Sequence, residues 1–184
     1  MTAVAWLAAA ALLAAPVPAA EPARGHVQFV FKQMNVPVEG AFKHFRTQVR
    51  FDPKQPEQSR AEIEIDLRSI DTGIPEADAE AQSPEWFDTA RTPTASFVST
   101  AVRNPAPDRY EVTGRLTIKG RTQVITVPVQ ARRAGAGTVY EGRFTLKRLD
   151  FALGEGIWTD TTAVANEVEV RFRLAPAVDP PRVP

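Results

Sequence analysis

The sequence predicts an all-β fold, an eight-stranded antiparallel barrel with a short capping helix between the third and fourth strands. Three observations support this prediction. Apolar and polar side chains alternate with period two over most of residues 25–174, short turn signals separate the alternating runs, and each clear run is apolar on one side alone. Period two places successive side chains on opposite faces of a strand. One-sided strands have to bury their apolar faces against one another.

The clearest strand is residues 61–68. Ala, Ile, Ile and Leu occupy the odd positions, and Glu, Glu, Asp and Arg occupy the even positions. A helix would spread these charges around its circumference, so the pattern predicts a strand. The same reasoning predicts strands at residues 25–34, 44–51, 94–102, 109–119, 122–132, 139–147 and 164–174.

Turn signals separate most of these strands. They stand at Glu39-Gly40, Asp52-Pro53, Asn104-Pro105, Lys119-Gly120 and residues 135–137. Such short connections join antiparallel neighbours. Residues 69–93 form a longer interval with a helix-tolerant stretch at 75–82, where Pro75 suits the first helical position. We expect this segment to cap an open end of the barrel.

A closed barrel buries every apolar face and leaves no sheet edge, while a two-sheet sandwich would bury the same faces. The predicted inward positions mix bulky aromatic residues with small ones such as Ala61, Gly114 and Gly142. An interior of eight strands is near the size at which it is either filled by side chains or holds one small ligand. The mixture of sizes is consistent with a hollow interior.

Composition excludes several function classes. Lys plus Arg and Asp plus Glu each total 22, so no net charge draws the chain to nucleic acid. Cysteine is absent, which excludes disulfides, thiolate nucleophiles and thiolate metal ligands.

The N-terminal segment resembles an export signal. Residues 3–15 contain Ala, Leu, Val and Trp alone, and Val17 and Ala19 suit the small-residue positions before a cleavage site. A retained membrane anchor is the alternative, although the run is short for a membrane span. We therefore expect a signal peptide at 1–19, the barrel domain at 20–176 and a Pro-rich tail at 177–184.

Several segments, in order along the chain, carry a family resemblance. They are Val38 to Phe42, Val49 to Pro53, Ile65 to Gly73, Trp86 to Asp88 with Pro93 and Ala95 to Phe97 after them, Tyr110 to Gly120, and Lys147 to Phe151. Together they resemble the YceI-like, lipocalin-like barrel proteins of bacterial periplasms. The resemblance implies an eight-stranded lipocalin-like barrel, a periplasmic location, and an interior that binds a polyisoprenoid, an isoprenoid quinone or a similar amphiphile. Many members carry a His in the first strand, in the region where this chain reads Phe31 to Asn35 and has no His. Gln33 in this region cannot carry a positive charge, so a head-group preference due to that His is not expected to transfer.

No catalytic or metal-binding motif is found in the sequence. The chain has two histidines, His26 at the start of the first strand and His44 on an outward face, and both fit surface positions better than a catalytic base. It contains no Gly-x-Ser-x-Gly, Ser-x-x-Lys or His-Glu-x-x-His segment. We expect no enzymatic activity, no metal and no cofactor.

The ligand-binding residues are predicted from the inward faces and the capping segment. The apolar lining comprises Phe29, Phe31, Phe45, Phe51, Ile63, Ile65, Trp86, Phe87, Phe97, Tyr110, Leu116, Phe144, Leu146, Trp158 and Phe172. The candidate head-group contacts are Gln33, Asn35, Arg148 and Asn166, chosen by residue type. Trp86 and Phe87 suit either a plug of the barrel end or a lip for an apolar chain. Trp158 shares this ambiguity, in a Gly-rich loop that could gate entry.

The leading hypothesis is an exported carrier of an isoprenoid lipid or quinone. The partners considered are that lipid, a membrane donor or acceptor, and a second copy in a homodimer, with nucleic acid excluded. The alternative is a packed barrel without ligand that acts as a stress-related interaction protein.

Overall fold

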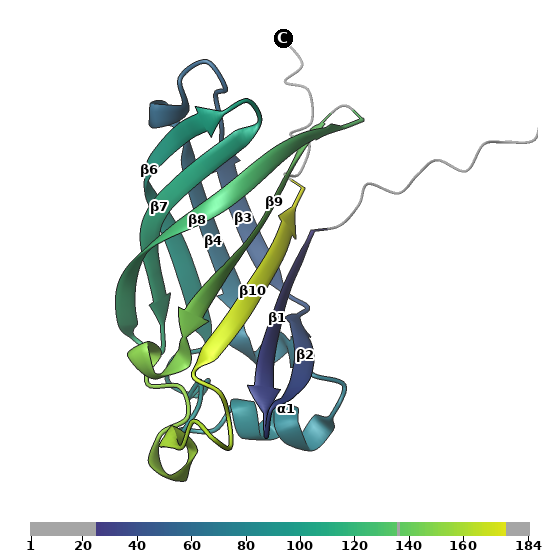
Figure 1. Cartoon of the computed structure of the whole chain (residues 1–184), viewed down its shortest axis with the longest axis vertical. Helices are drawn as coiled ribbons and strands as arrows, with labels where there is room; N and C mark the ends of the chain where they lie inside the picture. The colour runs from purple at the N-terminus through teal and green to yellow at the C-terminus, as the bar shows by residue number, and fades with distance from the viewer. Residues whose placement is uncertain (1–24, 136, 176–184) are drawn as a thin grey trace, which may run out of the picture.

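The computed structural model describes residues 25–135 and 137–175, so the predicted signal peptide and Pro-rich tail lie outside the described part. The described part folds into one antiparallel sheet with a single α-helix, α1 (Pro75–Ala81) (Figure 1). Its strands are β1 (His26–Gln33), β2 (Val36–Phe42), β3 (Phe45–Arg50), β4 (Arg60–Asp66), β5 (Ile70–Asp71), β6 (Thr94–Ala106), β7 (Arg109–Ile118), β8 (Arg121–Ala134), β9 (Gly137–Lys147) and β10 (Glu167–Leu174).

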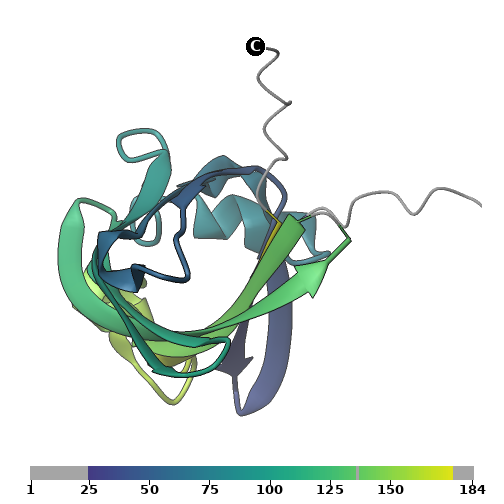
Figure 2. The ribbon, with the colours of Figure 1, turned by 90° about the horizontal axis from the view of Figure 1, so that it is seen from above.

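The sheet curls around one interior as a half-barrel, with the strand order β3-β4-β6-β7-β8-β9-β10-β1-β2-β5 (Figure 2). The two edge strands of the sheet are β3 and β5. They lie close together because β3 directly follows β2, the neighbour of β5, and β5 directly follows β4, the neighbour of β3. The backbone hydrogen bonds from Lys43 N to Ser69 O and from Asp66 N to His44 O, both 3.0 Å, join these segments. The predicted barrel-like, all-β fold is therefore confirmed.

The strand count is ten and not the predicted eight, because β2 and β5 were not expected. Glu39-Gly40 is not a turn but lies within β2, where Gly40 pairs with Phe29. The turn falls earlier, at Met34 and Asn35, which have φ angles of 48° and 64°. Two residues with positive φ form the tight loop that suits a twisted hairpin. The short β5 continues β4 after a 3₁₀ turn at Leu67–Ser69.

The capping helix is confirmed. α1 begins at Pro75, whose fixed φ suits the first helical turn, and lies across the end of the barrel that carries the β1–β2 turn (Figure 1). We call this the lower end, and the opposite end, near residues 52–59, the upper end. The segment at 148–160 also lies at the lower end.

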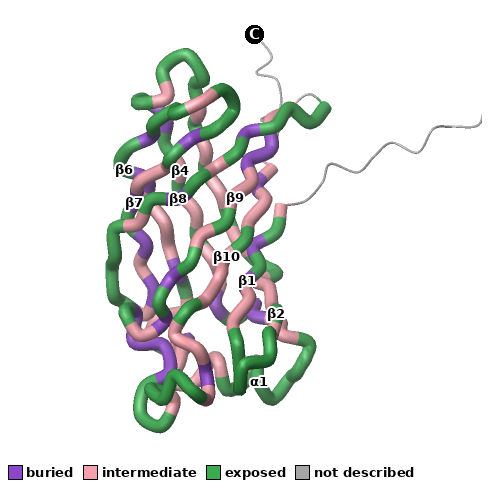
Figure 3. Tube along the Cα trace, viewed as in Figure 1, coloured by how far each residue is buried: buried purple, intermediate pink, exposed green. Residues whose placement is uncertain are grey.

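Buried residues occur along the whole length of the sheet, between intermediate and exposed ones (Figure 3). They form a lower cluster that includes Leu67, Leu116 and Phe151, and an upper cluster that includes Val102 and Tyr140. Within the described residues, no helix is long and apolar enough to cross a membrane.

Candidate ligand-binding site

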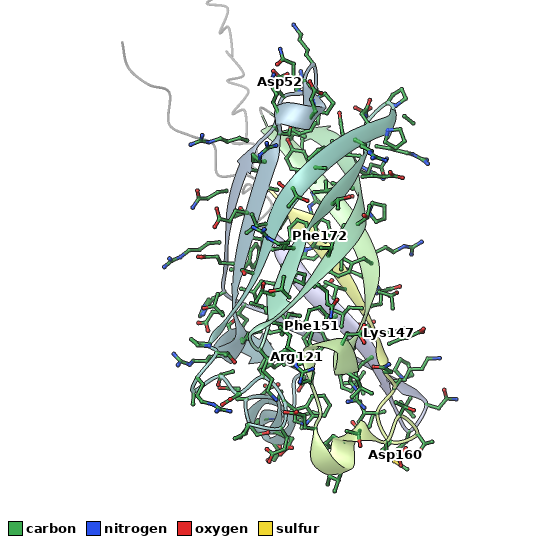
Figure 4. All side chains as sticks on the ribbon, turned by 90° about the vertical axis from the view of Figure 1, so that its left-hand side faces the viewer. Asp52, Arg121, Lys147, Phe151, Asp160 and Phe172 are labelled. Carbon is green, nitrogen blue, oxygen red and sulfur yellow. The ribbon has the colours of Figure 1, made fainter. Side chains whose placement is uncertain are left out.

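Two cavities lie one after the other inside the curled sheet. The lower cavity, of about 400 Å³, is enclosed by strands, α1 and the loop at 153–164. The upper cavity, of about 130 Å³, is enclosed almost wholly by strands. Figure 4 shows Phe172 among the strands, with Asp52 at the upper end and Asp160 at the lower end.

The same five apolar side chains line both cavities. They are Val27, Ile65, Leu116, Phe144 and Val170, one each from β1, β4, β7, β9 and β10. Three of these strands, β9, β10 and β1, are neighbours in the sheet, and β4 and β7 lie further along it. We call the five residues the girdle. The girdle is the boundary between two parts of one interior.

Three glycines explain how an interior rich in phenylalanine stays hollow. Gly40 lies against the ring of Phe29, Gly114 against that of Phe97, and Gly142 against that of Phe172. A Cβ at Gly142 would stand 2.5 Å from Cζ of Phe172, closer than side-chain carbons approach. Each ring therefore lies over a glycine in the barrel wall, and volume nearer the axis is left free.

The structure places most predicted lining residues at these cavities. The upper cavity is bordered by Phe51, Ile63, Phe97, Tyr110 and Phe172, the lower by Phe29, Phe31, Trp86, Phe87, Leu146 and Trp158, and both by Ile65, Leu116 and Phe144. Phe45 borders neither cavity and packs against the upper cluster.

The four candidate head-group residues occupy different surroundings. Gln33 and Arg148 border the lower cavity, whereas Asn35 and Asn166 do not. Asn35 lies in the β1–β2 turn with an exposed side chain. The Asn166 side-chain oxygen accepts a hydrogen bond from Leu149 N at 3.1 Å. This bond fixes the start of residues 148–166, the segment between β9 and β10 that we call the lower loop.

Arg148 is a buried cation that holds the lower loop. Its relative exposure is 1%. Its guanidinium donates to five backbone oxygens, those of Leu153, Gly154, Trp158, Val164 and Ala165, at 2.6–3.3 Å. Burial lowers the pKa of Arg148, but a guanidinium remains protonated in proteins. Because all five N–H groups are engaged, Arg148 has no free hydrogen-bond donor for a ligand. It can still interact with a ligand through its positive charge.

Aromatic pairs line both cavities. The Trp86 ring lies 5.8 Å from that of Trp158 and 5.4 Å from the Arg148 guanidinium carbon. At the upper end, Phe51 packs edge-on against Tyr110 at 4.7 Å and Tyr140 at 5.4 Å. Burial is the main cause that raises the pKa of both tyrosines. Three aromatic rings in mutual contact thus line the upper cavity.

Sequence reasoning missed two groups of lining residues. One is the helix α1, which contributes Glu76, Ala77, Glu80 and Ala81 to the lower cavity. The period of four between Glu76 and Glu80 places both on one helix face, but it does not say which face meets a cavity. The other group is small strand residues such as Val127 and Val129 of β8, which alternation alone could have indicated. Within the described ranges, no three His, Cys, Asp or Glu side chains gather to hold a metal ion.

Comparisons with known proteins agree with this architecture. The sequence profile of the YceI-like domain matches residues 19–175. The chain is 33% identical over 139 residues to Protein YceI of Salmonella arizonae, which covers 71% of this chain and 69% of that protein. The crystal structure of BcnA from Burkholderia cenocepacia superposes with a TM-score of 0.82 at 42% identity, covering 85% of this chain and 99% of that one. A polyisoprenoid binding domain from Saccharophagus degradans has a TM-score of 0.66 at 20% identity, covering 82% and 92% of the two chains.

Proposed function

The chain belongs to the YceI-like family, and from this premise we propose that it is an exported protein that holds a polyisoprenoid, an isoprenoid quinone or a similar amphiphile in its interior. The observation that carries the proposal is the pair of adjoining apolar cavities inside the sheet. The name of the Saccharophagus degradans neighbour, a polyisoprenoid binding domain, is consistent with this ligand class.

Burial of apolar surface provides the binding energy. Each square ångström of chain removed from water contributes about 25 cal/mol, or about 0.8 kcal/mol for each buried methylene. Part of that gain is offset by the lost freedom of the ligand. The interior therefore favours a slender chain over a compact polar molecule. The hollow interior favours this proposal over the packed barrel that acts through its surface alone.

Native mass spectrometry with lipid extraction tests the proposal. The full chain is produced with its N-terminal segment in a Gram-negative host, and the protein is purified from the periplasm. We expect a bound species with the mass of an isoprenoid, and binding of added ubiquinone or farnesol to the delipidated protein. An empty protein that binds neither compound would contradict the proposal.

Export is tested separately by the N-terminus of the same material. We propose cleavage after Ala19, with the barrel domain beginning at residue 20. Intact mass and N-terminal sequencing of the periplasmic protein should show this terminus. Retention of residues 1–19 in a membrane fraction would instead support the anchor.

A further inference from the structure

Exposed aliphatic side chains gather at the lower end of the barrel. Within residues 25–135 and 137–175, the exposed large apolar side chains are Met34 at 77%, Val36 at 61%, Ile74 at 52%, Val124 at 70% and Ile157 at 83%. All but Val124 belong to segments of the lower end: the β1–β2 hairpin, the residues before α1, and the lower loop (Figure 1). We call these four residues the apolar rim. Apolar residues that gather on one part of a surface mark a contact site.

Each member of the apolar rim lies beside a residue that lines the lower cavity. The neighbours along the chain are Met34 with Gln33, Ile74 with Glu76 two residues later, and Ile157 with Trp158. Val36 pairs with the same Gln33 across the β1–β2 hairpin. Gln33 and Glu76 are exposed, so the lower cavity reaches the surface beside the rim. The upper cavity also has an exposed lining residue, Arg60, but no member of the rim lies at that end.

The arrangement of the rim favours a fluid apolar phase over a shaped protein surface. Its four side chains come from three separate segments, among them the tight turn at Met34 and the 3₁₀ turn at Gly156–Thr159. A protein partner would need a surface that matches all three segments at once. The boundary between headgroups and acyl chains of a bilayer takes up separated apolar side chains without such a match. An isoprenoid could also pass between this phase and the adjoining cavity without exposing its chain to water.

Charges at the rim indicate which lipids it meets. On the segments that carry the rim, residues 32–36, 71–80 and 155–160, carboxylates outnumber cations by six to one. Two of the six, Asp71 and Glu155, are paired with lysines of neighbouring segments. A net negative charge therefore borders the rim, and it repels the headgroups of anionic lipids.

We propose that the lower end docks on a lipid bilayer through the apolar rim, that it prefers zwitterionic to anionic headgroups, and that the ligand moves between the bilayer and the lower cavity at this contact. The inference rests on the proposed function for its cargo, whereas docking involves the protein and the bilayer alone. Four aliphatic side chains hold about as many methylene-sized groups as one myristoyl chain, which supports reversible membrane binding only. Docking is therefore transient.

Vesicle flotation tests the docking on the delipidated protein purified from the periplasm. The protein should float with vesicles of phosphatidylcholine and phosphatidylethanolamine. It should float less when part of this lipid is replaced by phosphatidylglycerol, and added salt should reduce the difference because it screens the repulsion. Absence of binding to the zwitterionic vesicles, or stronger binding to the anionic ones, would overturn the proposal.

Matched substitutions locate the docking surface. Ile157→Ser and Met34→Ser should each lower the vesicle partition coefficient by about tenfold, because each removes one aliphatic side chain from the bilayer. Val124→Ser, which replaces an exposed aliphatic residue on β8, is the control and should leave the coefficient unchanged. All three positions are exposed, so the fold should tolerate the changes. Equal losses in the rim variants and the control would contradict the assignment.

A fluorescent label shows which end meets the bilayer. Because the chain has no cysteine, a single introduced cysteine can carry an environment-sensitive dye. On addition of zwitterionic vesicles, the emission of a dye at Ile157→Cys should shift to shorter wavelength. A dye at Lys54→Cys, exposed between β3 and β4 at the upper end, should show no shift. The reverse pattern would mean that the upper end docks, and would refute the proposal.

Uptake of ubiquinone from vesicles connects docking with the cavity. Ile157→Ser should slow this uptake by about tenfold and leave the affinity for farnesol in solution unchanged. An unchanged uptake rate would refute transfer at the rim. A protein that docks on vesicles but binds neither ubiquinone nor farnesol would overturn the proposed function and leave the docking in place. A protein that binds both compounds but no vesicles would overturn the docking alone.

Discussion

Lys119 connects three segments at the lower end through its ammonium group, and its carboxylate partner is Glu155. Lys119 Nζ donates to Glu155 Oε2 at 2.8 Å, to Pro84 O at 2.7 Å and to Ala152 O at 3.0 Å. The β7–β8 turn is thereby joined to the segment after α1 and to the lower loop. These are two of the elements that enclose the lower cavity.

Replacing Lys119 with Met should destabilise the fold by about 1–2 kcal/mol, because the Lys119 side chain is 9% exposed and the backbone oxygens of Pro84 and Ala152 would each lose a donor. Urea unfolding measures this loss. Lys147→Met on the exposed face of β9 is the control and should shift the free energy of unfolding by less than about 0.5 kcal/mol. Equal effects of the two variants would contradict this role for Lys119.

The Lys119–Glu155 contact should make stability depend on pH in the acidic range. The hydrogen bond from Lys119, and then its charge, lowers the pKa of Glu155. A lowered pKa contributes stability above the unfolded value, about 4.3, and that contribution is lost as the pH falls through the folded value. Glu155→Gln should therefore be less stable than the unmodified protein near neutral pH, and the gap should close in acid. Urea midpoints across this range measure it, and a gap that persists in acid would disprove the link.

Arg148→Met should cost about 3 kcal/mol or more, because five backbone oxygens of the lower loop would lose their donor. Arg148→Lys retains the charge with fewer donors, so its free energy of unfolding should lie between those of Arg148→Met and the unmodified protein. Chemical denaturation of both variants checks the order, with Arg143→Met on the exposed face of β9 as the control. A loss no greater than that of Arg143→Met would show that the loop folds without Arg148.

Alkaline pH should weaken the upper end through Tyr140. Burial first, and then the charge of Tyr110, raises the pKa of Tyr140. A raised pKa contributes stability below the unfolded value of about 10 and loses it as the pH rises through the folded value. Tyr140→Phe should therefore lose less stability than the unmodified protein between about pH 9 and pH 11. Thermal unfolding at several pH values tests this, and parallel losses in the two proteins would count against it.

Gly114→Ala should destabilise the barrel by about 1–3 kcal/mol, because a Cβ there would stand 2.6 Å from Val98 O and against the ring of Phe97. Gly137→Ala on β9 is the matched control, since its Cβ would have Ala134 O as its nearest neighbour, at 4.0 Å. Thermal denaturation should show the first variant well below the second. Similar melting temperatures would mean that Phe97 moves aside at little cost.

The sequence determined the strands with strict alternation, the capping helix and most of the cavity lining. The burial pattern of residues 61–68 can be predicted from their sequence alone. Successive side chains of a strand point to opposite faces, so the pattern depends on neighbouring residues only. β2 was missed because Gly40 is a turn signal by type, and its fit in a strand depends on the ring of Phe29 from the neighbouring strand. A local sequence pattern does not predict such a pairing between residues of two strands.

Only the tertiary structure decided the roles of particular side chains at the site. Arg148 and Asn166 are equal candidates by residue type, yet one binds five backbone oxygens that lie 5 to 17 residues away along the chain, and the other holds Leu149 N. The face that α1 turns toward the cavity, with Glu76 and Glu80, likewise depends on how the helix docks. The alternation of apolar and polar side chains can be read from the sequence, because it depends on neighbouring residues alone. Cavity shape and hydrogen-bond partners arise from segments that meet only after the sheet has curled.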